Sequence, residues 1–267
     1  MHENVKAGLT FLSFDLLAKE IGVVQAITSR AGGVSLPPFE SLNLGVSVGD
    51  SWECVAGNYQ LISRALGIGL DSFMTCKQVH GDRVIVIAER DGAKNPFSHE
   101  REEADAMVTN ISGLVLMVRV ADCVPVLFFD PVQKAVAIAH AGWRGTLKGI
   151  AAKTVEVLID RYKSDPSTIL AGIGPGIGPC CYEVGNKVRA LYEKRFSSGR
   201  RLFEERKGKS YLNLWEANRR QLLNTGIREE NIELAGLCTA CHPQIFFSHR
   251  REKGRTGRFA ALIGMRE

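Results

Sequence analysis

The stretch GLVLMVRVADCVPVLFFDPVQKAVAIAHAGWRG, residues 113–145, decides the fold class of this protein. It contains three apolar runs, at 113–120, 124–129 and 134–142, each with the length and composition of a β-strand. Residues 130–133 separate the last two runs and have proline at the second position, as a tight turn favours. The stretch therefore predicts neighbouring strands that pair antiparallel.

Helical patterns are interspersed with these strands. Apolar residues at a spacing near 3.6 predict one helix over 52–66 and another from 147 to about 163. A third helix is expected over about 185–196, after the turn GPGIGP. Further strand-like segments are 23–35, 168–174, 232–239 and 257–265. This alternation predicts a mixed α/β (α+β) fold with layered sheets, and the absence of a linker or repeat in residues 1–267 predicts a single domain.

The composition is that of an ordinary globular protein. Of the 267 residues, 45% are hydrophobic and 24% are charged, so the chain can bury a large core. The net charge of +5 suits an anionic small molecule but is too small for the basic footprint of a nucleic-acid-binding protein. We therefore expect a small-molecule partner and no nucleic acid.

Nothing in the sequence indicates export or a membrane. The first 20 residues lack a basic segment, a long apolar segment and a small-residue cleavage site. The apolar run at 113–118 ends at Arg119, long before it could span a bilayer. The seven cysteines are odd in number and irregularly spaced. We therefore expect reduced thiols and a cytoplasmic protein with no membrane partner.

The motif CTACH, residues 238–242, is a pattern found at c-type haem attachment sites and in half of many zinc sites. Covalent haem requires export, which the sequence does not indicate. A second ligand pair is missing downstream, where only His249 remains. We therefore expect Cys238 and Cys241 to support a site from the end of a strand, and we assign no ligand role to His242.

Cys123 and His140 flank the predicted hairpin. If residues 131–132 form a two-residue turn, the residue numbers of each pair across the hairpin add up to 263. Cys123 then lies directly opposite His140, with Cβ atoms about 4.5–5.5 Å apart. A thiolate and an imidazole so placed could hold one metal ion or act as nucleophile and base. A slip of one residue would put them on opposite faces of the sheet.

His80, in the motif KQVHG, is a third candidate ligand. One cysteine and two histidines provide three protein ligands, the number expected when zinc keeps a fourth position open. Such a mixed thiolate and imidazole set favours zinc, although it also accepts copper. Each residue taken alone also fits a role in the core.

Eight sequence blocks together resemble one known family. They are TSRAGGVS, SLNLGVSVGD, KQVHG, ADAMVT, VADCVPVLFFD, AHAGWRGT, GPGIGPCCYEVG and CTACHPQIFFSHRREKGRTGR, and they cover residues 27–265. The family is that of the polyphenol oxidase or laccase-domain proteins, also described as purine nucleoside phosphorylases of the YfiH type. The resemblance implies that His80, Cys123 and His140 form a catalytic zinc site.

The same resemblance implies a layered αββα sandwich, similar to the catalytic domain of bacterial cytotoxic-necrotizing-factor deamidases. The implied activities are phosphorolysis of purine nucleosides (inosine, adenosine, guanosine and methylthioadenosine) and deamination of adenosine. Some bacterial members have a role in keeping peptidoglycan precursors correct. Purine nucleosides and phosphate are thus the expected partners, bound by a monomer or small homo-oligomer.

The motif loops contain candidate substrate contacts. Arginine binds phosphate through its two-pronged guanidinium, and the candidates are Arg30, Arg144 and Arg258. Candidate contacts to base, sugar or the surroundings of the metal are Asn43, Gln78 and Asp122. Each arginine fits a solvated surface or a salt bridge that braces a loop equally well.

Three alternatives to a zinc-dependent phosphorylase and deaminase stay open. One is a metal-independent cysteine hydrolase that uses Cys123 and His140 on an amide or a peptidoglycan precursor. Another is a copper-dependent polyphenol oxidase, although six histidines without a His-x-His pair cannot build a conventional multicopper cluster. The third is a nucleic-acid or partner-binding module that uses HRREKGR, residues 249–255. The usual zinc deaminase signature is also absent.

Overall fold

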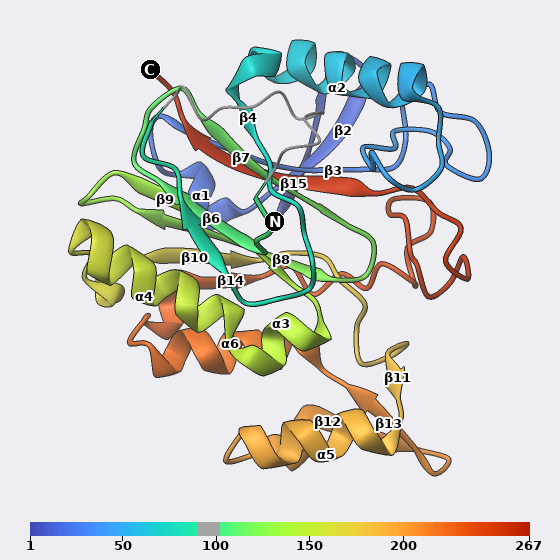
Figure 1. Cartoon of the computed structure of the whole chain (residues 1–267), viewed down its shortest axis with the longest axis vertical. Coiled ribbons are helices and arrows are strands. Elements are labelled where there is room, and N and C mark those ends of the chain that lie inside the picture. The colour runs from blue at the N-terminus through green and yellow to red at the C-terminus, as the bar shows by residue number, and fades with distance from the viewer. Residues whose placement is uncertain (90–101) are drawn as a thin grey trace.

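The computed structural model of the protein describes residues 1–89 and 102–267 and shows two β-sheets packed face to face between helices (Figure 1). The first sheet has the strand order β1 (His2–Lys6), β2 (Leu9–Ser13), β3 (Val23–Thr28), β15 (Phe259–Met265), β7 (Val115–Val120) and β4 (Phe73–Met74). The second has the order β14 (Ile232–Leu234), β10 (Leu170–Ile173), β8 (Val124–Asp130), β9 (Ala135–Ala141), β6 (Ala106–Thr109) and β5 (Val84–Val86). Parallel and antiparallel pairs occur in both sheets.

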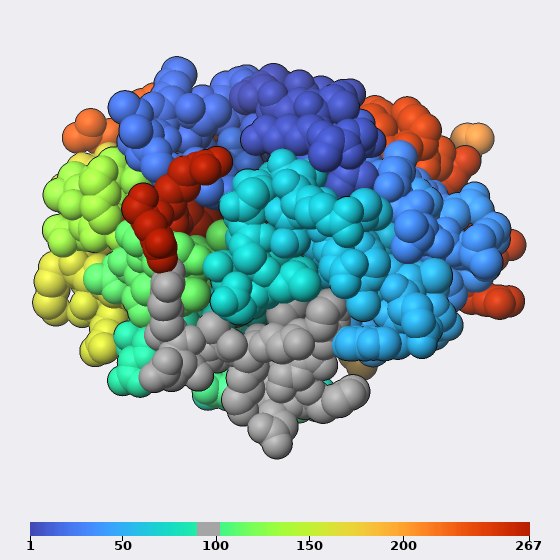
Figure 2. Space-filling model, turned by 90° about the horizontal axis from the view of Figure 1, so that it is seen from above, coloured from blue at the N-terminus to red at the C-terminus, as the bar shows by residue number. Residues whose placement is uncertain are grey.

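Helices cover the outer faces of both sheets. Helix α2 (Trp52–Leu66) lies on the first sheet, and α3 (Trp143–Lys148), α4 (Ile150–Tyr162) and α6 (Leu214–Asn224) lie on the second (Figure 1). Seen from the α2 side, the surface is formed largely by the N-terminal part of the chain, coloured blue to cyan (Figure 2). The layers are thus helix, sheet, sheet and helix, so the mixed α/β fold and its αββα layering are confirmed.

A smaller unit projects beyond these layers. It consists of the sheet β11 (Glu183–Val184), β13 (Lys209–Leu212) and β12 (Phe203–Arg206), together with α5 (Asn186–Arg195) (Figure 1). The sequence patterns predicted α5 but not these strands. The strands are short and mostly polar, so they show only a weak alternation of apolar and polar residues. A short helix α1 (Asp15–Ala18) follows the N-terminal hairpin. In the described parts of the chain, no helix is long and apolar enough to cross a membrane.

The strands β8 and β9 are buried along their whole length because both of their faces are covered. Side chains alternate between the two faces of a strand. Leu127 and Phe129 therefore pack against the first sheet, while Val126 and Phe128 pack under the helices. Two covered faces explain why these strands are continuous apolar runs rather than alternating patterns.

The hairpin register differs from the predicted one. The residue numbers of each observed pair add up to 265 instead of the predicted 263. Asp130 lies opposite Ala135, and Pro125 lies opposite His140. The prediction was wrong because the turn spans four residues, 131–134. The Asp130 carboxylate accepts hydrogen bonds from two backbone N–H groups of that turn, at 2.8 and 3.1 Å. Side chains alternate between the two faces of a sheet, so a register error of two residues leaves each side chain on its predicted face. Cys123 and His140 therefore still project to the same side of the sheet.

The expected helix over 147–163 is also corrected. It is two helices, α3 and α4, separated by Gly149 at φ +88°. Glycine adopts this left-handed conformation without the steric cost that other residues incur. Helix α3 begins at Trp143, earlier than predicted, so only Gly142 separates it from the end of β9. The expected strand at 232–239 is shorter as well, since β14 ends at Leu234.

Candidate functional site

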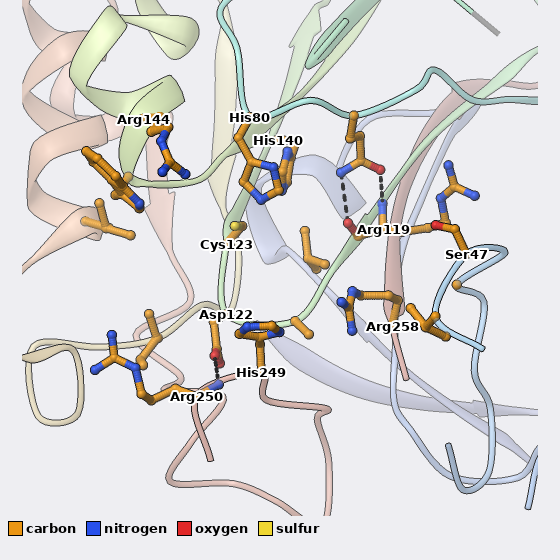
Figure 3. Close-up of a pocket in the computed structure, with 18 of the residues that line it drawn as sticks. Ser47, His80, Arg119, Asp122, Cys123, His140, Arg144, His249, Arg250 and Arg258 are labelled. Carbon is orange, nitrogen blue, oxygen red and sulfur yellow. Dashed lines mark hydrogen bonds between the residues drawn. The ribbon is translucent and has the colours of Figure 1, made fainter. Parts of the chain in front are cut away.

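Three segments of the chain bring His80, Cys123 and His140 together. His80 lies in the loop after β4, Cys123 in the turn between β7 and β8, and His140 near the end of β9. Their ligand atoms, one sulfur and two imidazole nitrogens, all lie within 4.8 Å of one another. The two imidazole rings meet edge to face, with centroids 4.8 Å apart (Figure 3). The three predicted ligands therefore form one group.

The backbone that carries two of these ligands is held in an uncommon conformation. His80 has φ +59°, and Asp122, which precedes Cys123, has φ +87°. Residues other than glycine rarely adopt such angles, and they do so where the surroundings hold them. The Asp122 carboxylate accepts hydrogen bonds of 2.6 Å from the Thr239 hydroxyl and from the backbone N–H of Arg250. These bonds fix the turn that presents Cys123.

A buried carboxylate, that of Asp105, connects the two histidines. Its Oδ1 lies 2.7 Å from Nδ1 of His140 and accepts the backbone N–H of His80 at 3.0 Å. Its Oδ2 accepts the backbone N–H groups of Val79 and Gly81, at 3.2 and 2.6 Å. A carboxylate on one ring nitrogen leaves the other nitrogen of His140 available to a metal ion, which is a common arrangement in metal sites.

Electrostatics favour an ion pair in the metal-free site. Burial raises the pKa of the Cys123 thiol, but the neighbouring His140 and His80 outweigh this and lower it to about 6. Burial lowers the pKa of His140, but the Cys123 thiolate and Asp105 raise it to about 9. Both shifts favour a thiolate at Cys123 and an imidazolium at His140 near neutral pH.

The donor set fits a metal ion. A thiolate and two imidazoles are the ligands of many zinc sites, and three protein ligands leave a fourth position open. His140 is buried, Cys123 is half-buried and His80 is exposed, so the open side faces solvent. Of the residues that the structure describes, only this group and a second one of four cysteines bring three or more such ligands together.

His80, Cys123 and His140 line a cavity of about 570 Å³. Four arginines, Arg119, Arg144, Arg250 and Arg258, line the same cavity (Figure 3). Within residues 1–89 and 102–267, none of the four has a carboxylate within 4.0 Å. The four guanidinium groups outnumber the Asp122 carboxylate in the cavity lining, and such an excess of positive charge attracts anions. The cavity is therefore suited to a phosphate or another anion.

Two of these arginines are oriented by backbone carbonyls. Arg258 donates from Nη1 to the carbonyls of Thr256 and Gly257, both at 2.9 Å, and burial lowers its pKa. Arg119 donates from Nη2 to the carbonyl of Cys76 at 3.3 Å, while its Nη1 is buried without a hydrogen-bond partner. A buried donor without a partner is costly, so an anion in the cavity would satisfy Arg119.

The structure separates the six predicted substrate contacts into two sets. Gln78, Asp122, Arg144 and Arg258 line the cavity. Both ends of the Gln78 side-chain amide, however, bond to the backbone of Arg119, at 2.9 Å each. Gln78 therefore orients the strand that carries Arg119. Arg144 lies over the ring of Trp143, 4.4 Å from its centroid, with its guanidinium exposed.

Arg30 and Asn43 lie outside the cavity lining. Arg30 forms an ion pair of 2.8 Å with Glu252 and packs 4.5 Å over the ring of Phe247. The fully buried Asn43 accepts the N–H of Gly45 and of Arg258 at 2.9 and 2.8 Å. These bonds assign both side chains to holding loops, and their contact with a substrate stays a prediction.

Sequence reasoning missed several residues around the site. Asp105, Arg119, Tyr182 and Arg250 were not predicted, although each lies within or beside a motif block. The sequence could have indicated Arg119 as a functional residue, because it is a lone cation inside an apolar strand. Asp105 carried a weaker signal as the acidic residue just before β6.

Comparisons with known proteins identify the family of this chain and several relatives. A family profile described as multi-copper polyphenol oxidoreductase laccase matches residues 24–266. Purine nucleoside phosphorylase YlmD of Bacillus subtilis is 38% identical over 248 residues, which cover 92% of this chain and 89% of that protein. Purine nucleoside phosphorylase YfiH of Escherichia coli is 37% identical over 242 residues, which cover 91% and 93%. The crystal structure of YlmD from Geobacillus stearothermophilus matches with a TM-score of 0.92 and 36% identity, covering 100% of this chain and 98% of that one. The chain therefore belongs to the multi-copper polyphenol oxidoreductase laccase family, in which these relatives are named purine nucleoside phosphorylases.

Proposed function

We propose that this protein is a zinc-dependent purine nucleoside phosphorylase. The observation that carries the proposal is that His80, Cys123 and His140 line the same cavity as four arginines, none of which has a carboxylate within 4.0 Å among the residues that the structure describes. A volume of about 570 Å³ lies within the usual range for small-ligand sites. The names of the relatives supply the substrate class, a purine nucleoside with phosphate.

In the proposed reaction, a phosphate oxygen forms a bond to C1′ as the bond from C1′ to the purine breaks. The electron pair of the broken bond leaves with the purine, which takes up a proton. In this proposal Arg119, Arg144 and Arg258, which line the cavity, bind the phosphate through charged hydrogen bonds. Tyr182 lines the cavity, and burial raises its pKa, so it keeps its proton and is available as a donor to the substrate.

A bound zinc would supply a Lewis acid next to the reacting groups. The chain's part is to hold the ligands in place: Asp105 fixes the ring of His140 and the loop of His80. Pre-positioned groups lower the barrier because they do not have to reorganise during the reaction.

A panel of nucleosides tests this function. Zinc-loaded protein is incubated with inosine, guanosine, adenosine and methylthioadenosine, with and without phosphate, and products are identified by mass. We expect free purine and the pentose 1-phosphate only when phosphate is present. Cys123→Ala should lose this activity together with the zinc ion bound by His80, Cys123 and His140. Failure to release any purine from the four nucleosides would contradict the proposal.

We propose adenosine deamination as a second activity of the same centre. The open side of the three ligands favours it, because a metal with a free position can activate water. In the same panel, adenosine without phosphate should yield inosine and ammonia. Adenosine that stays unchanged without phosphate would rule this activity out and leave phosphorolysis unaffected.

The Cys123–His140 ion pair favours a different candidate, a metal-independent cysteine hydrolase acting on an amide or a peptidoglycan precursor. Metal removal separates it from the phosphorylase. A hydrolase that uses Cys123 as nucleophile should work without metal and be blocked by iodoacetamide. The phosphorylase should lose its activity on chelation and regain it with zinc. Recovery with copper and a phenol as substrate would instead favour the polyphenol oxidase.

A further inference from the structure

A second group of possible metal ligands lies apart from the pocket. Cys180 and Cys181 follow β10 in the turn before β11, and Cys238 and Cys241 follow β14. Their four sulfur atoms all lie within 4.8 Å of one another. CTACH has no partner pair downstream, and for this reason its sequence alone did not favour a zinc site. The partner pair lies upstream, about 60 residues away, and the parallel pairing of β10 with β14 brings it close.

The distances fit a single metal ion. Sγ of Cys241 lies 3.5 Å from Sγ of both Cys180 and Cys181. With zinc–sulfur bonds of about 2.3 Å, the sulfur atoms of a tetrahedral site are about 3.8 Å apart. An iron–sulfur cluster spaces its four thiolates more widely, since several iron and sulfide ions lie between them. The group therefore matches a mononuclear centre.

The backbone already aligns the two cysteine pairs. A β-bridge pairs Gly176 with Cys238, and the Thr239 N–H donates to the carbonyl of Gly176 at 3.1 Å. The N–H of Gly178 donates to Sγ of Cys238 at 3.2 Å. A hydrogen bond to sulfur favours the thiolate, which is the form that binds metal.

Positively charged side chains and a cavity lie next to the four cysteines, so a metal ion can reach them. Four thiolates around Zn²⁺ carry a net charge of −2, which nearby cations would offset. Arg250 and Arg251 line a shallow cavity of about 410 Å³ together with Cys180 and Cys181. Arg251 is directed there by a hydrogen bond of 3.2 Å to the carbonyl of Ala240.

We propose that Cys180, Cys181, Cys238 and Cys241 bind one zinc ion as a structural tetrathiolate site. On binding, thiols that are protonated release their protons to solvent, and no electron is transferred. The site would fix one wall of the substrate pocket, because Ile177 and Tyr182 flank the first pair and Thr239, between the second pair, bonds to Asp122. This inference does not depend on the proposed function.

Metal content and a cobalt spectrum test the site together. We expect about two zinc ions per wild-type chain, one in C180S/C241S and one in Cys123→Ala. Cys180 and Cys241 are exposed, so replacing them should leave the core intact. The control is Cys54→Ser, at a cysteine on α2 outside both groups, which should keep both ions. Cobalt-substituted Cys123→Ala should show the intense charge-transfer bands of four thiolates and strong tetrahedral bands, whereas C180S/C241S should show only the weaker charge-transfer band of one thiolate, that of Cys123.

Two outcomes would overturn this site. One is a wild-type chain with a single metal ion that Cys123→Ala removes completely and C180S/C241S retains. The other is an intact mass about 2 Da lower per disulfide, with no tetrathiolate cobalt spectrum after reduction. The second outcome would show that these cysteines pair with one another instead of binding metal. Neither result depends on catalytic activity, so loss of the phosphorylase reaction would not be mistaken for loss of this site.

Discussion

The buried carboxylate of Asp105 lies 2.7 Å from Nδ1 of His140 and so directs the other ring nitrogen toward Cys123. The same carboxylate accepts three N–H groups of the loop that carries His80. One side chain thus positions two candidate ligands, His80 and His140, that are 60 residues apart in sequence. Asp105 is a positioning residue, and its effect should appear first in metal affinity.

Replacing Asp105 with asparagine should weaken zinc binding about 10–100-fold, the usual effect of losing a partner of a metal ligand. Asparagine keeps one acceptor oxygen, so either His140 or the loop N–H groups lose their partner. Affinity is measured by competition with a chromophoric chelator in the C180S/C241S background, where one zinc site remains. The matched control is Asp130→Asn, a buried carboxylate that caps the β8–β9 turn. Equal zinc affinities in the two variants would contradict the role of Asp105.

Zinc binding at this centre should release protons in a pH-dependent number. At pH 7.5 Cys123, with a pKa of about 6, is already a thiolate, while His140, with a pKa of about 9, still carries a proton that zinc must displace. We expect release of about one proton at pH 7.5, falling toward zero above about pH 9 and rising below about pH 6. Calorimetry of C180S/C241S in buffers with different ionisation enthalpies measures this number. Release near zero at pH 7.5 would show that His140 is neutral before metal binds.

The candidate site shows which structural features local sequence patterns reveal. The hairpin was predictable because β8 and β9 are apolar runs separated by a proline turn. Its register was not, because the Asp130 carboxylate favours a wider turn through bonds that periodicity does not reveal. The predicted register was wrong by two residues, an even number, so the predicted face of the sheet for Cys123 and His140 was still correct.

Contacts between distant segments were beyond these patterns. Asp105 reaches His140 because β6 pairs with β9, and the pair of Cys180 and Cys181 reaches CTACH because β10 pairs with β14. Neither pairing has a local signal, since strand order depends on how whole faces pack. The resemblance to a family singled out His80, Cys123 and His140, which the structure brings together, whereas the groups that position them required the three-dimensional arrangement.

Arg144→Ala should weaken phosphate binding more than nucleoside binding. The exposed Arg144 guanidinium lies at the cavity without a carboxylate partner among the described residues. Loss of a charge-assisted hydrogen bond worth about 1.5–3 kcal/mol corresponds to a roughly 10–100-fold higher KM for phosphate. Steady-state kinetics with each substrate varied in turn measures both constants, and Arg64→Ala, on the exposed side of α2, is the control. An unchanged KM for phosphate in Arg144→Ala would place the phosphate elsewhere in the cavity.

Gly142→Ala should damage the metal centre without damaging the fold, because the clash it creates is local. A Cβ atom at Gly142 would lie 2.9 Å from Sγ of Cys123 and 3.1 Å from Cδ2 of His80, so one of these ligands must move. The backbone angles of Gly142, φ −73° and ψ 173°, are open to alanine. Gly185 is a matched control, since it also precedes a helix, has φ −79° and ψ 165°, and has no atom within 4 Å of an added Cβ. Both variants should lose a similar small amount of thermal stability as metal-free proteins, whereas zinc affinity should fall about tenfold or more in Gly142→Ala alone. A Gly142→Ala protein that binds zinc as tightly as Gly185→Ala would mean that the ligands have more room than their positions around Gly142 indicate.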